Sequence, residues 1–197
     1  MKISKDFSHT IRFSADFHFW DTSLLTAIGQ TPQGKGRPFD TTHEMDATLL
    51  QNINHHIGEN DILFFLGDFS VYDMRTIQQQ REKIRCKNIH CIVGNIDIHF
   101  TQYGELFTSV HHYQQVVFEK RNTTAVLFHY PLLVRDKAYA GRIHLHGHTH
   151  NRLPPNQGKM MDVGVDTYHF KPYRIEEIIE SMNQKEIVLQ YGSPRTE

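Results

Sequence analysis

The sequence NIHCIVGNID, residues 88–97, joins an apolar run to a short polar turn. Its first six residues, NIHCIV, have the β-branched and apolar character of a buried strand, and Gly94 ends the run. Asn95 and Asp97 follow, with the apolar Ile96 between them. The two polar residues are either ordinary turn residues or part of a site, and the rest of the chain has to distinguish these interpretations.

β-like runs of the same kind recur along the chain. They occupy residues 10–15, 61–66, 88–93, 114–119, 123–128, 142–146, 160–165 and 186–191. A short polar link joins the runs at 114–119 and 123–128, which predicts a β-hairpin and therefore a partly antiparallel sheet.

Helical patterns lie between some of these runs. An apolar stripe at i, i+4 spacing covers residues 45–57, a second pattern covers 74–84, and a third covers 172–182 with Pro172 at its first turn. The mixture of buried strands and amphipathic helices predicts an α/β layered fold. No linker or repeat divides the sequence, so we expect one domain over residues 1–197.

The composition predicts a soluble protein without a strong electrostatic field. Lys and Arg number 21 and Asp and Glu 22, a formal net charge of -1, which argues against strong binding to duplex nucleic acid. The sequence has neither a signal peptide nor an apolar run long enough for a bilayer, so we expect no membrane association and a cytoplasmic location. Cys86 and Cys91 form no CxxC pair, and we expect reduced, packed thiols. The composition specifies no oligomeric state.

Metal-capable side chains stand where the predicted strands end. The chain has 15 histidines, and imidazole is the commonest side-chain metal ligand. The candidate residues are Asp16, His18, Asp68, Asn95, His129, His148 and His150. Because ligands of α/β sheets bind at the carboxyl ends of the strands, these side chains can converge on one site. Each fragment alone is also explained by a turn or a packed histidine, so the inference depends on their combination.

In chain order these residues form the pattern Asp-x-His, Gly-Asp, Gly-Asn, His and Gly-His-x-His. Over residues 16–150 the pattern resembles the calcineurin-like metallophosphoesterase superfamily. The segments HLHGHTH (144–150) and VGVDTYHFKPYRIEEI (163–178) are also similar to its small bacterial and phage-type members. The resemblance implies a sandwich of two mixed β-sheets flanked by helices, in agreement with the α/β fold inferred above.

The resemblance also implies two divalent metal ions. One would be held by Asp16, His18, Asp68 and His150, and the other by Asp68, Asn95, His129 and His148. Mixed nitrogen and oxygen ligation suits Mn²⁺, Fe, Co, Ni or Zn²⁺ better than Ca²⁺, and Mn²⁺ is our first expectation. The implied activity is hydrolysis of a phosphodiester or phosphomonoester of a small, nucleotide-type substrate by a metal-bridging hydroxide, with Asp68 bridging the ions.

The chain departs from the family pattern at the turn that follows residue 94. The family signature Gly-Asn-His-Asp has a histidine where this chain has Ile96, and that histidine protonates the leaving oxygen or stabilises the transition state. We assign catalytic roles to Asp97, the acid that remains, and to His99 as a candidate substitute, with an exposed loop histidine as the alternative. A second departure is Trp20-Asp21, and we assign no role to Asp21.

Arg37 and Arg135 are candidates for binding substrate phosphate, because guanidinium groups match phosphate oxygens. The alternative for each is a solvated arginine in a loop. Ile96 also supports a second hypothesis, a non-catalytic scaffold or regulatory protein that keeps the fold and the metals. A third hypothesis, a single structural metal site, requires only some of the ligands, and a metal count distinguishes it.

Overall fold

The computed structural model describes residues 1–4, 10–25, 36–154 and 157–188. Its strands are β1 (Lys2–Ile3), β2 (Ile11–Ser14), β3 (Ile62–Phe65), β4 (Asn88–Ile92), β5 (Ser109–His111), β6 (Tyr113–Phe118), β7 (Thr123–Phe128), β8 (Ile143–His146), β9 (Met160–Asp162) and β10 (Tyr173–Arg174). Its α-helices are α1 (Thr42–His56), α2 (Met74–Lys83) and α3 (Ile175–Asn183). Short 3-10 helices are η1 (Thr22–Leu24), η2 (Phe100–Glu105), η3 (Glu119–Arg121), η4 (Ala138–Ala140) and η5 (Val165–Thr167).

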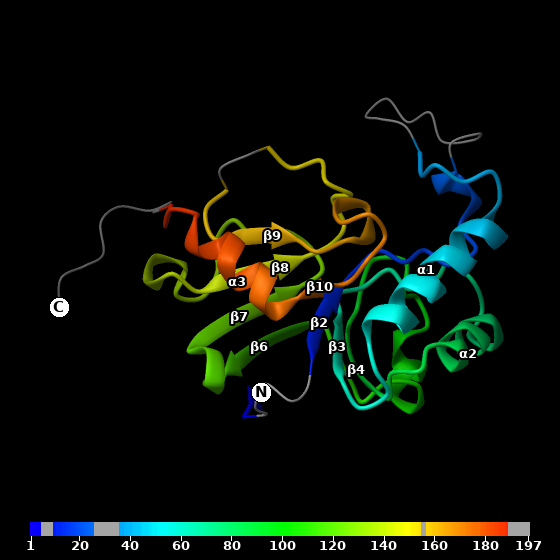
Figure 1. Cartoon of the computed structure of the whole chain (residues 1–197), viewed down its shortest axis with the longest axis horizontal. Coiled ribbons are helices and arrows are strands. Elements are labelled where there is room, and N and C mark those ends of the chain that lie inside the picture. Colours follow the sequence, from blue (N-terminus) through cyan, green and yellow to red (C-terminus); the bar gives the residue numbers. More distant parts are fainter. Residues whose placement is uncertain (5–9, 26–35, 155–156, 189–197) are drawn as a thin grey trace.

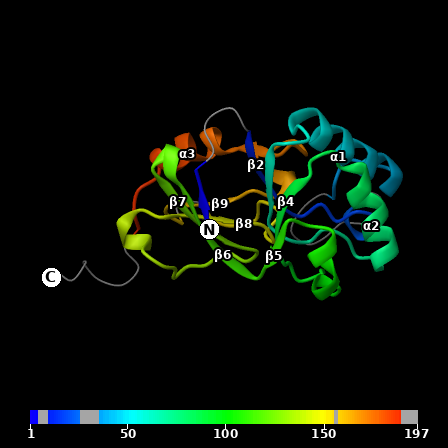
Figure 2. The same ribbon diagram turned by 90° about the horizontal axis from the view of Figure 1, so that it is seen from below.

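The strands form two mixed five-stranded sheets, with orders β10-β2-β3-β4-β5 and β1-β6-β7-β8-β9. Within the first sheet only β10 and β2 are antiparallel, and within the second only β6 and β7, which form the predicted hairpin. Helices α1 and α2 lie on the side of the first sheet that faces away from β6–β9 (Figure 1), and the view from below shows the same arrangement (Figure 2). The predicted α/β sandwich flanked by helices is therefore confirmed.

The central strand β3 is buried on both faces. Phe64 lies in the core between the sheets, where its ring centroid is 5.2 Å from that of Phe13 and 5.9 Å from that of Phe118. Leu63 and Phe65 belong to the second core, which packs the opposite face of the sheet against α1 and α2. Successive strand residues point to opposite faces, so burial on both faces explains why this segment reads as an unbroken apolar run.

The three predicted helices are confirmed, with different ends. Helix α1 begins after Thr41, whose hydroxyl accepts a hydrogen bond from the Glu44 N–H at 3.2 Å. Pro172 was predicted to lie in the first turn of α3. The helix instead begins at Ile175, because Tyr173 first pairs with β2 as part of β10.

The predicted strand at 186–191 is wrong for residues 186–188, which form no strand, and residues 189–191 lie outside the described residues. Ile187 and Val188 lie close to Gly141 and Gly158 without strand pairing. The short strands β1, β5 and β10, each of two or three residues, were not predicted, because so few residues show no periodicity. Both cysteines are buried and unpaired among the described residues.

Loops that follow strands of the two sheets meet at one rim. Ala15, after β2, forms a parallel bridge with Gly164, after β9. The Gly147 N–H, after β8, donates to the His129 carbonyl, after β7, at 3.0 Å. The fold therefore brings the strand-end residues of both sheets together, as the sequence predicts.

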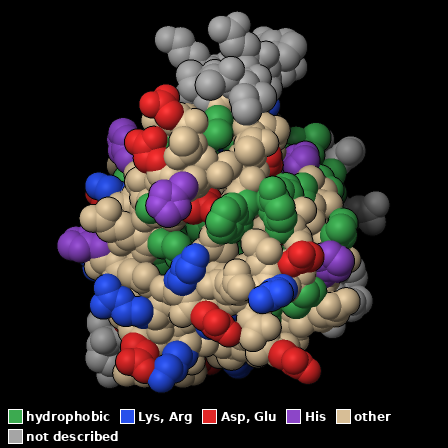
Figure 3. Space-filling view, turned by 90° about the vertical axis from the view of Figure 1, so that its right-hand side faces the viewer, with side chains coloured by type: hydrophobic (Ala, Val, Ile, Leu, Met, Phe, Trp, Pro, Cys, Tyr) green, Lys and Arg blue, Asp and Glu red, His purple; other side chains and the backbone are tan. Residues whose placement is uncertain are grey.

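The surface agrees with the weak net charge. Acidic and basic side chains are interspersed over the face in Figure 3, without a patch of one sign. In the described part of the chain, no helix has the length and apolar character that crossing a membrane requires.

A buried histidine, His144, ties β8 to its neighbours. Its Nδ1 donates to the Val126 carbonyl at 3.0 Å, and its Nε2 accepts from the Leu132 N–H at 2.9 Å. Burial lowers the pKa of His144 to about 3, so the ring is neutral near pH 7. This histidine of the HLHGHTH segment is therefore a structural residue that fixes the chain after β7.

We expect His144 to make the fold acid-sensitive. Its pKa rises from about 3 to the ordinary 6.5 on unfolding, so the unfolded chain binds an extra proton between these values, and stability falls as the pH drops below 6.5. Relative to His144→Gln, the wild-type protein should lose about 2 kcal/mol more between pH 7 and pH 5. Urea unfolding of both metal-free proteins measures this difference, and parallel pH profiles would contradict it.

Candidate metal centre

The rim gathers the seven predicted ligands into two neighbouring groups. Within each group, the possible ligand atoms all lie within 4.8 Å of one another. The first group consists of Asp16, His18 and His150, and the second of Asp68, His129 and His148. Asn95, after β4, joins the second, because its Oδ1 lies 2.8 Å from His148 Nδ1 and 2.9 Å from His129 Nε2. The fold thus brings together the seven residues that the family resemblance implies, with Asp68 grouped with the second set.

Asp68 lies between the two groups. Its Oδ2 is 3.3 Å from His18 Nε2 and 3.4 Å from His129 Nε2. Its Oδ1 accepts a hydrogen bond from the Ile96 N–H at 3.1 Å. A carboxylate that faces one histidine of each group can bridge two cations.

The donor set fits divalent metal ions. His18 Nε2 is buried without a hydrogen-bond partner of acceptable geometry among the described residues, although the Asp68 carboxylate is near it. An imidazole nitrogen left in this way costs free energy unless a ligand pairs with it. The imidazole, carboxylate and amide donors around it suit Mn²⁺, Fe, Co, Ni or Zn²⁺.

Groups behind the histidines fix which ring nitrogen faces the centre. His18 Nδ1 lies 3.0 Å from Asp21 Oδ2, and His150 Nδ1 lies 2.7 Å from Asp166 Oδ2. His129 Nδ1 is 2.7 Å from a backbone carbonyl. Such contacts to the outer nitrogen set the tautomer and leave Nε2 available for a metal.

Neither Asp21 nor Asp166 was predicted to contribute to the site. Asp21 lies three residues after His18, a spacing that could have signalled the pairing. Asp166 lies in the family-like segment 163–178, but its partner His150 is far from it in sequence, and only the fold brings them together.

The carboxylates and imidazoles of the centre shift one another's protonation. Burial alone would lower the pKa of His18, but the nearby Asp21 and Asp68 carboxylates outweigh it and raise this pKa to about 9. Burial would raise the pKa of Asp68, but the adjacent imidazoles of His129 and His18 hold it well below its usual range. Burial raises the pKa of Asp16 to about 6. Metal binding at His18 therefore has to displace a proton, which makes metal affinity fall with decreasing pH.

Five of the seven ligands have left-handed backbone conformations. Their φ angles are 58° at Asp16, 51° at His18, 62° at Asp68, 68° at His148 and 45° at His150. Non-glycine residues adopt this region rarely, and such strain concentrates at functional sites. These residues lie in separate loops, and their side chains meet in the two ligand groups.

Glycines of the motifs make room for the two carboxylates. A Cβ at Gly94 would lie 2.2 Å from Asp68 Oδ1, and a Cβ at Gly147 would lie 2.7 Å from Asp16 Oδ2. Both distances are below van der Waals contact, so only glycine fits at either position. The Gly-Asn and Gly-His pairs of the sequence therefore have a steric cause.

Asp97, predicted to be catalytic, organises the loops around Asp68, and its catalytic role stays a prediction. Its carboxylate accepts hydrogen bonds from the backbone N–H groups of Gly94 at 2.7 Å and of Asp68 and Phe69 at 2.9 Å. The Tyr103 hydroxyl donates a fourth at 3.3 Å. Burial raises the pKa of Asp97. A buried carboxylate that faces these backbone donors positions Asp68, and its oxygens are directed at protein groups.

His99, the other predicted catalytic residue, directly precedes η2. It is partly buried, and its side chain makes no hydrogen bond within the described part of the chain. In the part of the chain that the structure describes, no hydrogen bond, ion pair or ring contact joins its imidazole to the two ligand groups, so its role stays a prediction.

Arg37 is a structural residue instead of the predicted phosphate ligand. It is 4% exposed, and its Nε and Nη2 donate to the two Asp166 oxygens at 2.8 and 2.9 Å. The other donors bond the carbonyls of Phe17 at 2.8 Å and Asp16 at 2.6 Å. Its charge, with the His150 hydrogen bond, outweighs burial and holds the pKa of Asp166 well below its usual range.

Arg135 likewise donates hydrogen bonds to protein acceptors. Its guanidinium donates to the carbonyls of Leu132 at 3.3 Å and Lys159 at 3.1 Å. The prediction of a phosphate-binding role for Arg135 has no support in this geometry, because these hydrogen bonds fix the loop between β7 and β8.

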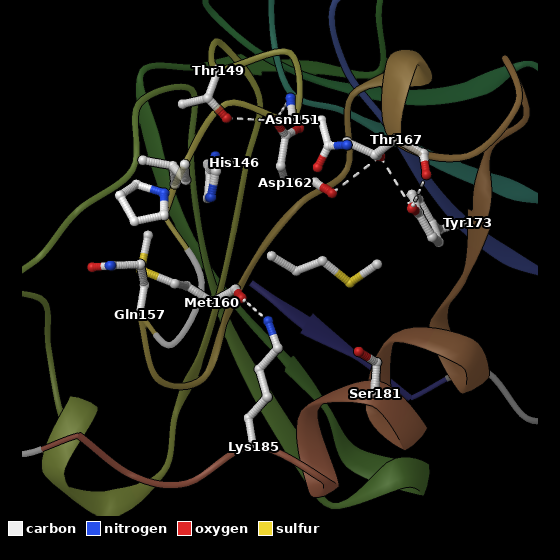
Figure 4. A pocket seen from close by; sticks show the side chains of 13 residues that line it. His146, Thr149, Asn151, Gln157, Met160, Asp162, Thr167, Tyr173, Ser181 and Lys185 are labelled. Carbon is white, nitrogen blue, oxygen red and sulfur yellow. Dashed lines mark hydrogen bonds between the residues drawn. The ribbon is translucent and has the colours of Figure 1, made fainter.

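Asp162 holds the loop that carries His148 and His150. Its carboxylate accepts hydrogen bonds from the Thr149 hydroxyl at 2.5 Å and from the Asn151 N–H at 3.0 Å. The Thr149 contact is visible in Figure 4, at the edge of a cavity of about 290 Å³ that Asp162 helps to line. None of the seven predicted ligands lines this cavity, so it lies outside the centre.

The steric role of Gly94 gives a testable prediction. Gly94→Ala should displace the Asp68 carboxylate and weaken Mn²⁺ binding by roughly 10- to 100-fold, the range found when groups that orient ligands are changed. Gly104→Ala is the matched control, because a Cβ there meets no heavy atom within 4 Å. Isothermal titration calorimetry measures both affinities, and equal affinities would exclude this role for Gly94.

Comparisons with known proteins agree with the fold and name no activity. No protein-family model matches the chain. An uncharacterized protein of Methanocaldococcus jannaschii, MJ1445, is 29% identical over 160 residues, which cover 77% of this chain and 83% of that protein. The crystal structure of a protein of unknown function from Aquifex aeolicus, AQ665, matches with a TM-score of 0.67 at 19% identity, covering 88% of this chain and 100% of that chain. This chain therefore shares its fold with the Aquifex protein.

Proposed function

We propose that this protein is a dinuclear metal-dependent phosphoesterase acting on a small, nucleotide-type phosphate ester. The observation that carries the proposal is the Asp68 carboxylate, which faces His18 of one ligand group at 3.3 Å and His129 of the other at 3.4 Å. A single structural ion would need neither this bridge nor the convergence of Asn95 on His129 and His148.

The charges of the ligands favour a phosphate ester as substrate. Asp16 and Asp68 are the only acids among the seven ligands, and the other five residues are neutral when they bind a cation. Two bound divalent ions would leave a net positive centre that polarises the phosphoryl group and lowers the pKa of water. The protein's part is to hold seven donors in place through buried hydrogen bonds and strained backbone.

The position of Ile96 restricts the leaving group. Its N–H supports the Asp68 carboxylate, but its side chain has no proton to give. General acid assistance contributes typically 10²- to 10⁴-fold, and its loss slows poor leaving groups most. We therefore expect the enzyme to prefer esters whose leaving group needs no protonation.

Metal counting and hydrolysis test the proposal together. The protein should bind about two Mn²⁺ ions per chain and hydrolyse bis-p-nitrophenyl phosphate only when metal is present. Asn95→Ala should retain one ion and lose most of the activity, because it removes a ligand of the second group only. His55→Ala, an exposed histidine of α1, serves as control and should change neither. One ion in the wild type, unaffected by Asn95→Ala, would instead support a structural site.

A scaffold or regulatory protein is the second candidate, and Ile96 is the observation that favours it. Such a protein would bind two ions without hydrolysing any ester. Absence of turnover in metal-loaded protein, with any of the divalent metals that suit the donors, would establish this candidate in place of the enzyme.

Restoring the missing histidine tests the role of residue 96. Ile96→His should raise the rate for an alkyl leaving group by about 100-fold or more, and the rate for p-nitrophenol much less, because only the former needs a proton. Steady-state kinetics with paired aryl and alkyl phosphodiesters measures the two effects. Equal effects would show that proton donation does not limit the wild-type protein.

A further inference from the structure

We propose that Tyr130 is a stacking platform for a planar ring on the substrate, which makes nucleobase-containing phosphates the preferred class. The inference rests on one part of the proposed function, namely that metal ions at the second ligand group would hold the phosphate. The platform itself follows from the exposure of the centre and from the surroundings of Tyr130.

The second ligand group is more exposed than the first, in which only His150 is partly exposed. Asp16 and His18 of the first group are buried, at 0% and 6% exposure. Asn95 and His148 of the second group are exposed. A phosphate that arrives from solvent therefore meets the second group first, and the remainder of the substrate lies over the residues around His148.

Tyr130 is the aromatic residue beside this exposed group. It directly follows the ligand His129, and its ring centroid lies 4.5 Å from that of His148 at an interplanar angle of 62°. The side chain is 39% exposed, and its hydroxyl makes no hydrogen bond within the described part of the chain. An exposed ring beside a ligand is the arrangement that stacks a base while its phosphate is bound.

The ring of Tyr130 is held in position before any substrate arrives. The centroid of the Phe128 ring lies 5.7 Å from that of Tyr130, and the centroid of the His129 ring lies 5.1 Å from it. The backbone just after it is fixed by the Leu132 hydrogen bond to His144. A ring that is already ordered loses little entropy on binding, so its contact contributes more to affinity.

Apolar residues follow the exposed Asn95 in its turn. They are Ile96 and Ile98, of which Ile98 is 73% exposed. The guanidinium groups of Arg37 and Arg135 are directed at protein acceptors instead. Beyond the phosphate, these surroundings favour recognition by ring stacking over recognition by a second charged group.

Binding of non-hydrolysable phosphonate analogues of AMP and of ribose 5-phosphate to the Mn²⁺-loaded protein tests the inference. The two ligands share the phosphonate and the ribose and differ only in the base. Calorimetry should show tighter binding of the AMP analogue by about 5- to 100-fold, the contribution of one base stacked on an aromatic ring. Tyr130→Phe should keep this preference, and Tyr130→Ala should abolish it while leaving the ribose analogue unaffected. Tyr139→Ala, which removes another exposed tyrosine, should change neither affinity.

The outcomes separate this inference from the proposed function. Equal affinities for the two analogues in the wild type, or a preference that survives Tyr130→Ala, would overturn the platform even if the protein hydrolyses phosphate esters. A preference lost in Tyr130→Ala supports the platform even if no ester is hydrolysed, because binding is measured without turnover.

Discussion

The Asp68 carboxylate imposes the central constraint on this structure. It is buried between His18 and His129, and its backbone N–H is held by Asp97 from the neighbouring loop. Gly94 leaves room for this carboxylate, because a Cβ at position 94 would overlap the Asp68 oxygen. The loops after β3 and β4 are thus shaped around one carboxylate, and the sheet beneath them supplies the rigid base.

Charge pairing extends from the centre into the body of the protein. The buried guanidinium of Arg37 joins the Asp166 carboxylate, which orients His150, to the backbone carbonyls of Asp16 and Phe17. The Arg37 guanidinium and the Asp166 carboxylate are largely buried as a pair, so neither carries the full cost of an isolated charge. Arg37, which the sequence suggested as a substrate ligand, holds Asp166 in the position from which it contacts His150.

Local patterns in the sequence were sufficient for some features and insufficient for others. The apolar run of β3 and the stripe of α1 predicted those elements, and the polar residues after each strand predicted which side chains would gather. The contacts of Asp97 and Arg37 were not foreseen because they involve partners that only the folded chain brings near, such as Tyr103 and Asp166. Pro172 was misplaced because pairing of Tyr173 with β2 overrides the local helix signal.

The left-handed backbone of the ligands has a consequence for how the protein keeps its shape. Each such residue raises the energy of the native loops by about 1 kcal/mol or more, and His148 and His150 share one loop. Cations bound at the rim would offset this cost and would cross-link the loops of the two sheets. Chelation would then release the segment 147–151 locally, so that resistance to proteases there reports the occupancy of the centre.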